Sequence, residues 1–118
     1  NKKIHFLGNV NNPFYFLNKS DLFVLNSEIE GFPNVLLEAL ACNLNIVSSN
    51  CKSGPGEILQ NEKYGLLYPV GNKRILKEKM EYFLYTKHNI KLDNSKYLES
   101  FSIDKIKNQF KEVLEVEY

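Results

Sequence analysis

The sequence has 118 residues, which is enough for one modest hydrophobic core and too few for two. Hydrophobic residues make up 43% and charged residues 25%, the balance of an ordinary globular domain, and no apolar run approaches the ~18 residues of a membrane span. A formal net charge of +1 and a single arginine, Arg74, argue against electrostatic binding to nucleic acid or to an anionic membrane.

Apolar runs alternate along the chain with helical patterns. The runs typical of buried strands are residues 4–7, 21–26, 45–49 and 64–70. The predicted helices are a short one within 9–20, then 33–42, a short one within 54–61, and 72–85 with Ile75, Met80, Phe83 and Leu84 toward a core. This order predicts an α/β fold: a Rossmann-like parallel sheet covered by helices, whose ligands bind outside the carboxyl ends of the strands.

The chain divides into three predicted parts. Residues 1–86 form the sheet domain, residues 87–95 a polar linker, and residues 96–118 C-terminal helices with an amphipathic stripe after the plausible N-cap Ser102. The sequence starts without methionine and runs directly into a strand-like segment. We therefore interpret it as an internal piece of a longer protein, and the sheet domain as incomplete at its N-terminus.

The helix predicted over residues 33–42 begins in an unusual way. Proline suits the first helical position, which leaves the amides of Asn34, Val35 and Leu36 without partners inside the helix. A helix N-terminus carries about half a positive charge, so free amides at the carboxyl edge of a sheet favour a phosphate or diphosphate. Water is the alternative partner for these amides.

Two carboxylates flank this helix start. Glu38 lies among apolar residues in a helix expected to be largely buried, so it needs hydrogen-bond donors or a cleft. Both Glu38 and Glu30 would repel a phosphate, and we expect them to accept hydrogen bonds from sugar hydroxyls, with the amides of Gly31 and Phe32 beside Glu30. The alternatives are a lysine paired with Glu38 and a solvated loop position for Glu30.

Other polar residues in this region favour structural roles. Asn43 follows the predicted helix, and asparagine tolerates the left-handed backbone conformation of a helix C-terminus. Cys42 and Cys51 show no metal-ligand spacing, so we interpret them as reduced thiols. We predict no metal site and no bound cofactor.

The residues around the two acids resemble a known family. The order is "FLGNV", "DLFVLNS", "EGFPNVLLE", "EALACNLNIVSS", "SGPGEIL" and "YGLLYPV", over about residues 4–72. It is similar to the retaining glycosyltransferases of family 4, which have the GT-B architecture and a motif of two glutamates separated by seven residues. The motif here reads Glu30-GFPNVLL-Glu38. Two glutamates at this spacing mean nothing alone, whereas the ordered set is specific.

The resemblance implies a role for each matching residue. Glu30 is the candidate catalytic residue and contacts the donor sugar, near the amides of Gly31 and Phe32. Glu38 binds the ribose hydroxyls. The remaining implied contacts are the diphosphate with the amides of Asn34, Val35 and Leu36, and the base with Gly8, Asn9 and Val10. Residues 53–57 would shape the far wall of the cleft, and the family needs no metal ion.

Two departures from the family pattern affect these expectations. The family commonly has glycine where this chain has Asn43, which the left-handed C-terminus tolerates. The basic pair near the diphosphate and the N-terminal acceptor-binding domain would both lie upstream of this sequence. We therefore expect this chain to bind a donor weakly and to transfer no sugar by itself.

The functional prediction is the nucleotide-sugar-binding half, with UDP-sugar as donor, of an enzyme that transfers a hexose or N-acetylhexosamine to a glycan or lipid-linked acceptor. The resemblance to bacterial polysaccharide enzymes implies a cytoplasmic protein and leaves peripheral membrane association of the full-length protein open. The alternatives are a sugar-nucleotide epimerase or phosphorylase of the same architecture, and a non-catalytic α/β module. An epimerase would need no acceptor, and a phosphorylase would require phosphate.

Overall fold

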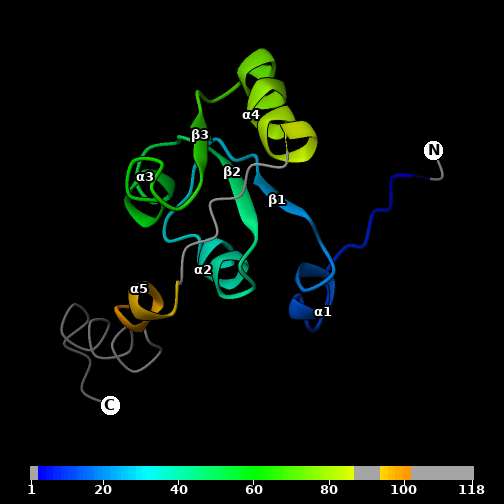
Figure 1. The fold of residues 1–118 in the computed structure, drawn as a ribbon, viewed down its shortest axis with the longest axis vertical. Helices are drawn as coiled ribbons and strands as arrows, with labels where there is room; N and C mark the ends of the chain where they lie inside the picture. Colours follow the sequence, from blue (N-terminus) through cyan, green and yellow to red (C-terminus); the bar gives the residue numbers. More distant parts are fainter. Residues whose placement is uncertain (1–2, 87–93, 102–118) are drawn as a thin grey trace.

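The structure is a computed structural model that describes residues 3–86 and 94–101 (Figure 1). Short helices and strands alternate along the chain, as predicted. Their bounds are α1 (Phe14–Leu17), β1 (Leu22–Leu25), α2 (Asn34–Ala41), β2 (Asn45–Ser49), α3 (Pro55–Ile58), β3 (Leu66–Tyr68), α4 (Lys73–Thr86) and α5 (Ser95–Glu99). No helix among the described residues is long and apolar enough to cross a membrane.

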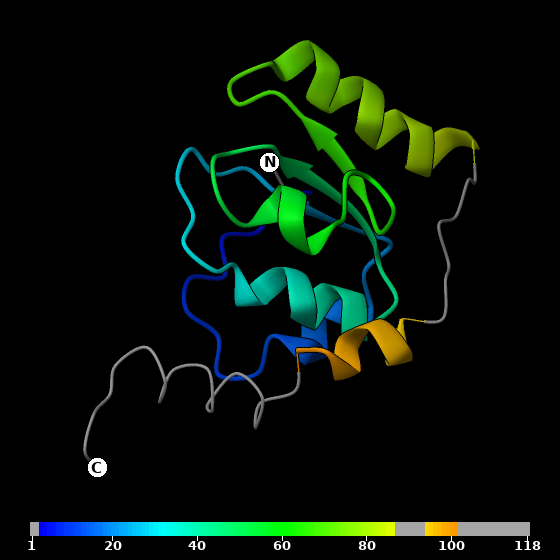
Figure 2. The same cartoon turned by 90° about the vertical axis from the view of Figure 1, so that its left-hand side faces the viewer.

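The three strands form one parallel sheet in the order β1-β2-β3. Leu22 pairs with Asn45 and Val47 pairs with Leu66, so each strand lies beside the next one in the chain. Helix α4 covers one face, and α2 and α3 cover the other (Figure 2). The predicted Rossmann-like α/β fold is therefore confirmed.

The two faces of β2 belong to two separate cores. Ile46 packs with residues of α2 and α3, whereas the next residue, Val47, packs with Tyr68 and with Phe83 of α4. Successive side chains of a strand point to opposite faces, and both residues are fully buried. A strand buried on both faces has to be apolar throughout its centre, which is the pattern that identified it in the sequence.

Helix α2 packs on the sheet through Leu36, Ala39 and Leu40, which are spaced three and four residues apart and are buried. Its end is a Schellman motif: the amide of Asn43 donates to the carbonyl of Leu40, and the amide of Leu44 donates to that of Ala39. Asn43 has φ 55°, so its predicted left-handed conformation is confirmed.

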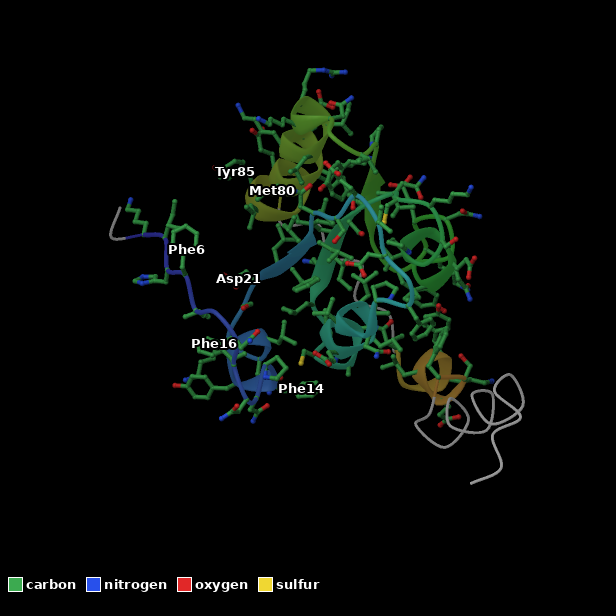
Figure 3. The ribbon with its side chains drawn as sticks, turned by 180° about the vertical axis from the view of Figure 1, so that it is seen from behind. Phe6, Phe14, Phe16, Asp21, Met80 and Tyr85 are labelled. Carbon is green, nitrogen blue, oxygen red and sulfur yellow. The ribbon has the colours of Figure 1, made fainter. Side chains whose placement is uncertain are left out.

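Helix α4 differs from its prediction at one apolar residue. Phe83 is buried at 5% exposure, and Ile75 packs on the same core, as predicted. Met80, labelled in Figure 3, is half-buried. Leu84 is 45% exposed, so its predicted place in the core is wrong. The next residue on a helix is rotated by about 100°, which takes Leu84 off the stripe that Phe83 occupies.

The predicted strand over residues 4–7 is also wrong. This segment forms an arm that runs away from the sheet, and the side chain of Phe6 is 96% exposed (Figures 1 and 3). A strand requires a neighbouring strand for its backbone hydrogen bonds, and no described strand lies beside this arm. Residues 87–93 of the linker predicted over 87–95 lie outside the described residues, as does the helix predicted after Ser102, so the domain boundaries stay a prediction.

Candidate functional site

The carboxyl ends of the parallel strands meet at one edge of the sheet, and the loops that follow them build the candidate site. These loops are residues 26–33 after β1, 50–54 after β2 and 69–72 after β3. The predicted site residues from Glu30 to Leu36 lie in the first of these loops and in the start of α2. The edge therefore brings most of the predicted site together.

Two serines connect the loops after β1 and β2. The hydroxyl of Ser49 donates to the carbonyl of Ser27 at 2.6 Å, and the amide of Ser27 donates to Ser49 Oγ at 3.0 Å. The hydroxyl of Ser27 in turn donates to Glu30 Oε1 at 2.7 Å. Glu30 is half-buried and is held by this chain of hydrogen bonds, so the alternative of a freely solvated loop acid is excluded.

The sequence prediction overlooked Ser27 and Ser49. Ser49 is the last residue of β2, and Ser27 lies two residues beyond the end of β1. Carboxyl ends of adjacent parallel strands lie side by side, so small polar residues at these two positions were a usable signal. The two serines lie outside the Glu30–Glu38 motif, but their hydrogen bonds position Glu30.

The loop before α3 packs against the turn of residues 31–33. Gly54 has φ 120°, and a Cβ atom built on it would lie 2.9 Å from the carbonyl oxygen of Gly31 and 2.9 Å from Cδ of Pro33. Only glycine fits this approach without displacing the turn. Gly54 therefore lies against the turn of the candidate site, and the predicted place of residues 53–57 in the far wall of the cleft stays a prediction.

The start of α2 differs in detail from the prediction. Pro33 is the N-cap with ψ 85° instead of the first helical residue. Its carbonyl accepts a hydrogen bond from the amide of Leu36 at 3.0 Å, and the amide of Asn34 donates to Phe32 at 2.9 Å. Two of the three amides predicted to be unpaired thus have partners. The amide of Val35 donates to no acceptor among residues 3–86 and 94–101, and α2 has no side-chain cap.

Helix α2 is buried on one side only, not largely buried as predicted, and Glu38 is half-buried. It lies at helical spacing from Asn34 and Ala41, which are exposed, because α2 has one face that no described residue covers. No described residue forms a hydrogen bond or ion pair with its carboxylate, so the structure does not support the paired-lysine alternative. Burial, and secondarily the charge of Glu38, raises the pKa of the Cys42 thiol one turn later.

Gly8, Asn9 and Val10 do not join the site in this structure. All three are exposed on the arm that runs away from the sheet (Figure 1), and no atom lies within 4 Å of the position where a Cβ of Gly8 would be. Their predicted contact with the base stays a prediction.

A cavity of about 460 Å³ lies at the same edge, between the ends of β1 and β3 and the start of α4. Asn26, Glu28 and Tyr68 line it on the sheet side, and residues 70–73 line it on the helix side. The Tyr68 hydroxyl donates to Asn26 Oδ1 at 2.5 Å, and burial raises the pKa of Tyr68. Two polar groups that line this cavity, the Tyr68 hydroxyl and the Asn26 side chain, therefore already bond to each other.

No group of three or more His, Cys, Asp and Glu side chains that could hold a metal ion occurs in the described part of the chain. The metal-independent chemistry inferred from the sequence remains a prediction, because it concerns the reaction and not these residues alone.

Comparison with known proteins gives a consistent result. The family model described as "Glycosyl transferases group 1" matches residues 1–101. An N-acetylgalactosamine-N,N'-diacetylbacillosaminyl-diphospho-undecaprenol 4-alpha-N-acetylgalactosaminyltransferase of Campylobacter jejuni is 40% identical over 72 residues, which cover 61% of this chain and 20% of the relative.

Two further relatives are similar over shorter or comparable stretches. An N,N'-diacetylbacillosaminyl-diphospho-undecaprenol alpha-1,3-N-acetylgalactosaminyltransferase of Campylobacter jejuni is 40% identical over 69% of this chain and 21% of its own length. A lipopolysaccharide 1,6-galactosyltransferase of Escherichia coli is 41% identical over 48% of this chain and 16% of its own length. The matched region thus spans only 16% to 21% of these relatives.

Proposed function

Since the chain belongs to the group 1 glycosyltransferases, we propose that it is the nucleotide-sugar-binding half of a retaining, family 4 enzyme of GT-B architecture. In this proposal the donor is a UDP-sugar, and a hexose or N-acetylhexosamine passes to a glycan or lipid-linked acceptor held by another domain. Relatives named for transfer of N-acetylgalactosamine to diphospho-undecaprenol substrates and of galactose to lipopolysaccharide support this class of acceptor.

The observation that carries the proposal is the arrangement of Glu30 at the carboxyl edge of the sheet. Ser27 donates a hydrogen bond to one oxygen of this carboxylate, and the uncapped start of α2 follows three residues later. A carboxylate held in place accepts hydrogen bonds from sugar hydroxyls, whereas a helix start without a side-chain cap attracts negative charge. The two features suit the two ends of a sugar diphosphate.

The proposed roles of the other residues follow from their positions. The amide of Val35 has no acceptor among the described residues, so it is the first candidate to donate a hydrogen bond to the diphosphate. The amides of Asn34 and Leu36 would have to exchange their present acceptors for the ligand. Glu38 faces the uncovered side of α2, about one turn from the helix start, where a ribose diol is within reach of a side chain.

Leaving-group stabilisation, not a covalent step, is the proposed source of catalysis. Glu30 and Glu38 position the donor, and the helix amides offset the charge that develops on the leaving diphosphate. The basic pair that completes this site in the family would come from a part of the protein upstream of residue 1. We therefore expect weak donor binding and no sugar transfer by this chain alone.

Titration of the isotope-labelled chain with UDP, GDP and ADP tests donor binding. We expect UDP to shift the backbone amide resonances of residues 31, 32 and 34–36, and a Glu38→Ala variant to weaken that response. Ser27→Ala is the matched positional control, since it should alter Glu30 without affecting the helix amides. If none of the three nucleotides perturbs these amides, a non-catalytic α/β module becomes the better reading.

Product analysis of the full-length protein separates the enzyme classes. We expect transfer of sugar only in the presence of an acceptor, with retention at the anomeric carbon detected by NMR of the product. Interconversion of the free sugar nucleotide without acceptor would indicate an epimerase, and a requirement for phosphate would indicate a phosphorylase. Sugar transfer by the 118-residue chain alone would contradict the assignment of this chain to the donor half.

A further inference from the structure

Four aromatic rings lie in series, and they come from the loop before α2, the loop before β3 and the region of α5. Tyr64 and Tyr97 stack with centroids 4.1 Å apart and planes 3° apart. Tyr97 also contacts Phe101 edge-on at 5.2 Å, and Phe101 contacts Phe32 at 6.1 Å. The last ring of the series therefore belongs to the Gly31-Phe32-Pro33 turn of the candidate site.

Helix α5 is tied to its surroundings at its N-cap and at its middle residue. The side-chain amide of Asn94, which is buried, donates to the carbonyl of Leu40 in α2 at 3.2 Å. The hydroxyl of Tyr97 donates to the carbonyl of Ile58 at the end of α3. Figure 2 shows α5 running alongside α2 in the opposite direction, so that its final residues approach the first turn of α2. These hydrogen bonds hold α5 in place, and Phe101, two residues after its end, contacts the turn through Phe32.

Phe32 by contrast has few restraints of its own. Its side chain is 47% exposed, and its carbonyl accepts a hydrogen bond from Asn34 next to it. Gly31 has no atom within 4 Å of the position where a Cβ would lie, so no side chain packs over that residue. The contact with Phe101 is therefore a restraint on the turn in addition to the close approach of Gly54.

We propose that Phe101, held by Tyr97, is a positioning residue that sets the conformation of the Gly31-Phe32-Pro33 turn and thereby the affinity of the site for its nucleotide-sugar donor. The effect on donor affinity rests on the proposed function, whereas the effect on the turn does not. An aromatic pair contributes beyond the burial of its area, and a small displacement of a binding group weakens ligand contacts disproportionately. A segment distant in sequence would in this way control the donor site without touching the donor.

The first test needs no ligand. Phe101→Leu keeps apolar volume but removes the ring, and Phe101→Tyr keeps the ring. We expect Phe101→Leu, and more so Phe101→Ala, to shift the amide resonances of Gly31 and Phe32, and Phe101→Tyr to restore them. Phe83→Leu is the control, because Phe83 is buried in the separate core beneath α4 and should lower stability without moving these amides. Unmoved turn amides in folded Phe101→Leu would overturn the proposal.

The second test measures the dissociation constant for UDP at a temperature where all variants are folded. We expect a rise of roughly threefold to tenfold in Phe101→Leu, recovery in Phe101→Tyr and no change in Phe83→Leu. If the turn amides move while UDP affinity stays unchanged, the positioning role is wrong. If the unaltered chain binds no UDP, the proposed function fails, and the ligand-free resonances still decide whether Phe101 sets the turn.

Discussion

Helices α2 and α4 both start at the carboxyl edge of the sheet, and they start differently. Helix α4 is capped by its own sequence: Asn72 Oδ1 accepts from the amide of Ile75 at 3.0 Å, and the Asn72 carbonyl accepts from Leu76. Helix α2 has Pro33 at the same position and no side-chain cap. Asparagine is among the preferred N-cap residues, whereas proline has no side-chain acceptor.

The difference separates a structural helix start from one that is available to a ligand. In α4 the side chain of Asn72 satisfies the amide of Ile75 from within the chain. The start of α2 leaves the amide of Val35 without an acceptor among residues 3–86 and 94–101, and its position depends on neighbours such as Gly54. Stability and ligand binding should therefore respond to different substitutions at the two starts.

The largest expected effect is at the glycines beside the two helix starts. Gly54→Ala should lower the free energy of unfolding by about 3 kcal/mol, because the residue has φ 120° and its Cβ would meet Gly31 and Pro33. Gly71→Ala, next to the cap of α4, should cost only about 1–2 kcal/mol, since φ is 79° and nothing lies within 4 Å. Chemical denaturation measures both free energies of unfolding. Equal losses in the two variants would show that the close approach of Gly54 to the turn adds nothing to the backbone strain.

The second effect concerns the cap of α4. Asn72→Ala should destabilise the chain by about 1 kcal/mol, through loss of the hydrogen bond to the amide of Ile75. Asn72 lies in the loop after β3 but has no proposed contact with the donor, so nucleotide binding should be unchanged. Asn72→Ser should recover most of the stability, because serine also caps helices. Weaker UDP binding in Asn72→Ala would mean that the start of α4 also takes part in the ligand site.

A smaller stability effect is expected at Glu38. Glu38→Ala should change the free energy of unfolding by less than about 0.5 kcal/mol, because no described residue pairs with the carboxylate and alanine favours helix. Its UDP affinity should nevertheless fall, which isothermal titration measures, and Glu38→Gln should retain part of it. A large stability loss with unchanged affinity would return Glu38 to a structural role.

The smallest effect is on the thiol of Cys42. Burial and the negative charge of Glu38 both disfavour the thiolate and raise its pKa, so Glu38→Gln should lower that pKa and speed alkylation of Cys42 at mildly basic pH. A group whose pKa is raised in the folded state contributes stability below its unfolded pKa, and that stability is lost as the pH rises toward the folded value. Mass spectrometry of alkylated peptides follows the reaction at Cys42 and Cys51 separately.

The sequence predicted the sheet well because its strands pack against apolar residues on both faces. The runs at 21–26, 45–49 and 64–70 contain β1, β2 and β3, and the helix patterns contain α1 to α3 and all of α4 except its last residue. The run at 4–7 has the same composition but no strand beside it among the described residues. Apolar composition indicates what a segment could bury, whereas pairing depends on whether a neighbour is present.

The site was predictable at the level of the loop and less so at the level of single hydrogen bonds. Spacing and the motif place Glu30 and the start of α2 at one edge, but the ψ angle of Pro33 decides which amides keep partners. The aromatic contact between Phe32 and Phe101 joins residues far apart in sequence. No periodicity within one element could have indicated it, because the contact depends on how α5 packs on α2.

The order of the strands also has a consequence for folding kinetics. Each strand pairs with the one that follows it along the chain, and paired residues are only ~20 positions apart. The sheet can therefore grow one crossover at a time as the polypeptide leaves the ribosome, and β1 and β2 can associate before β3 has been synthesised. The loops that carry Glu30 and Gly54 would then approach each other early, before α5 is available to close over the turn.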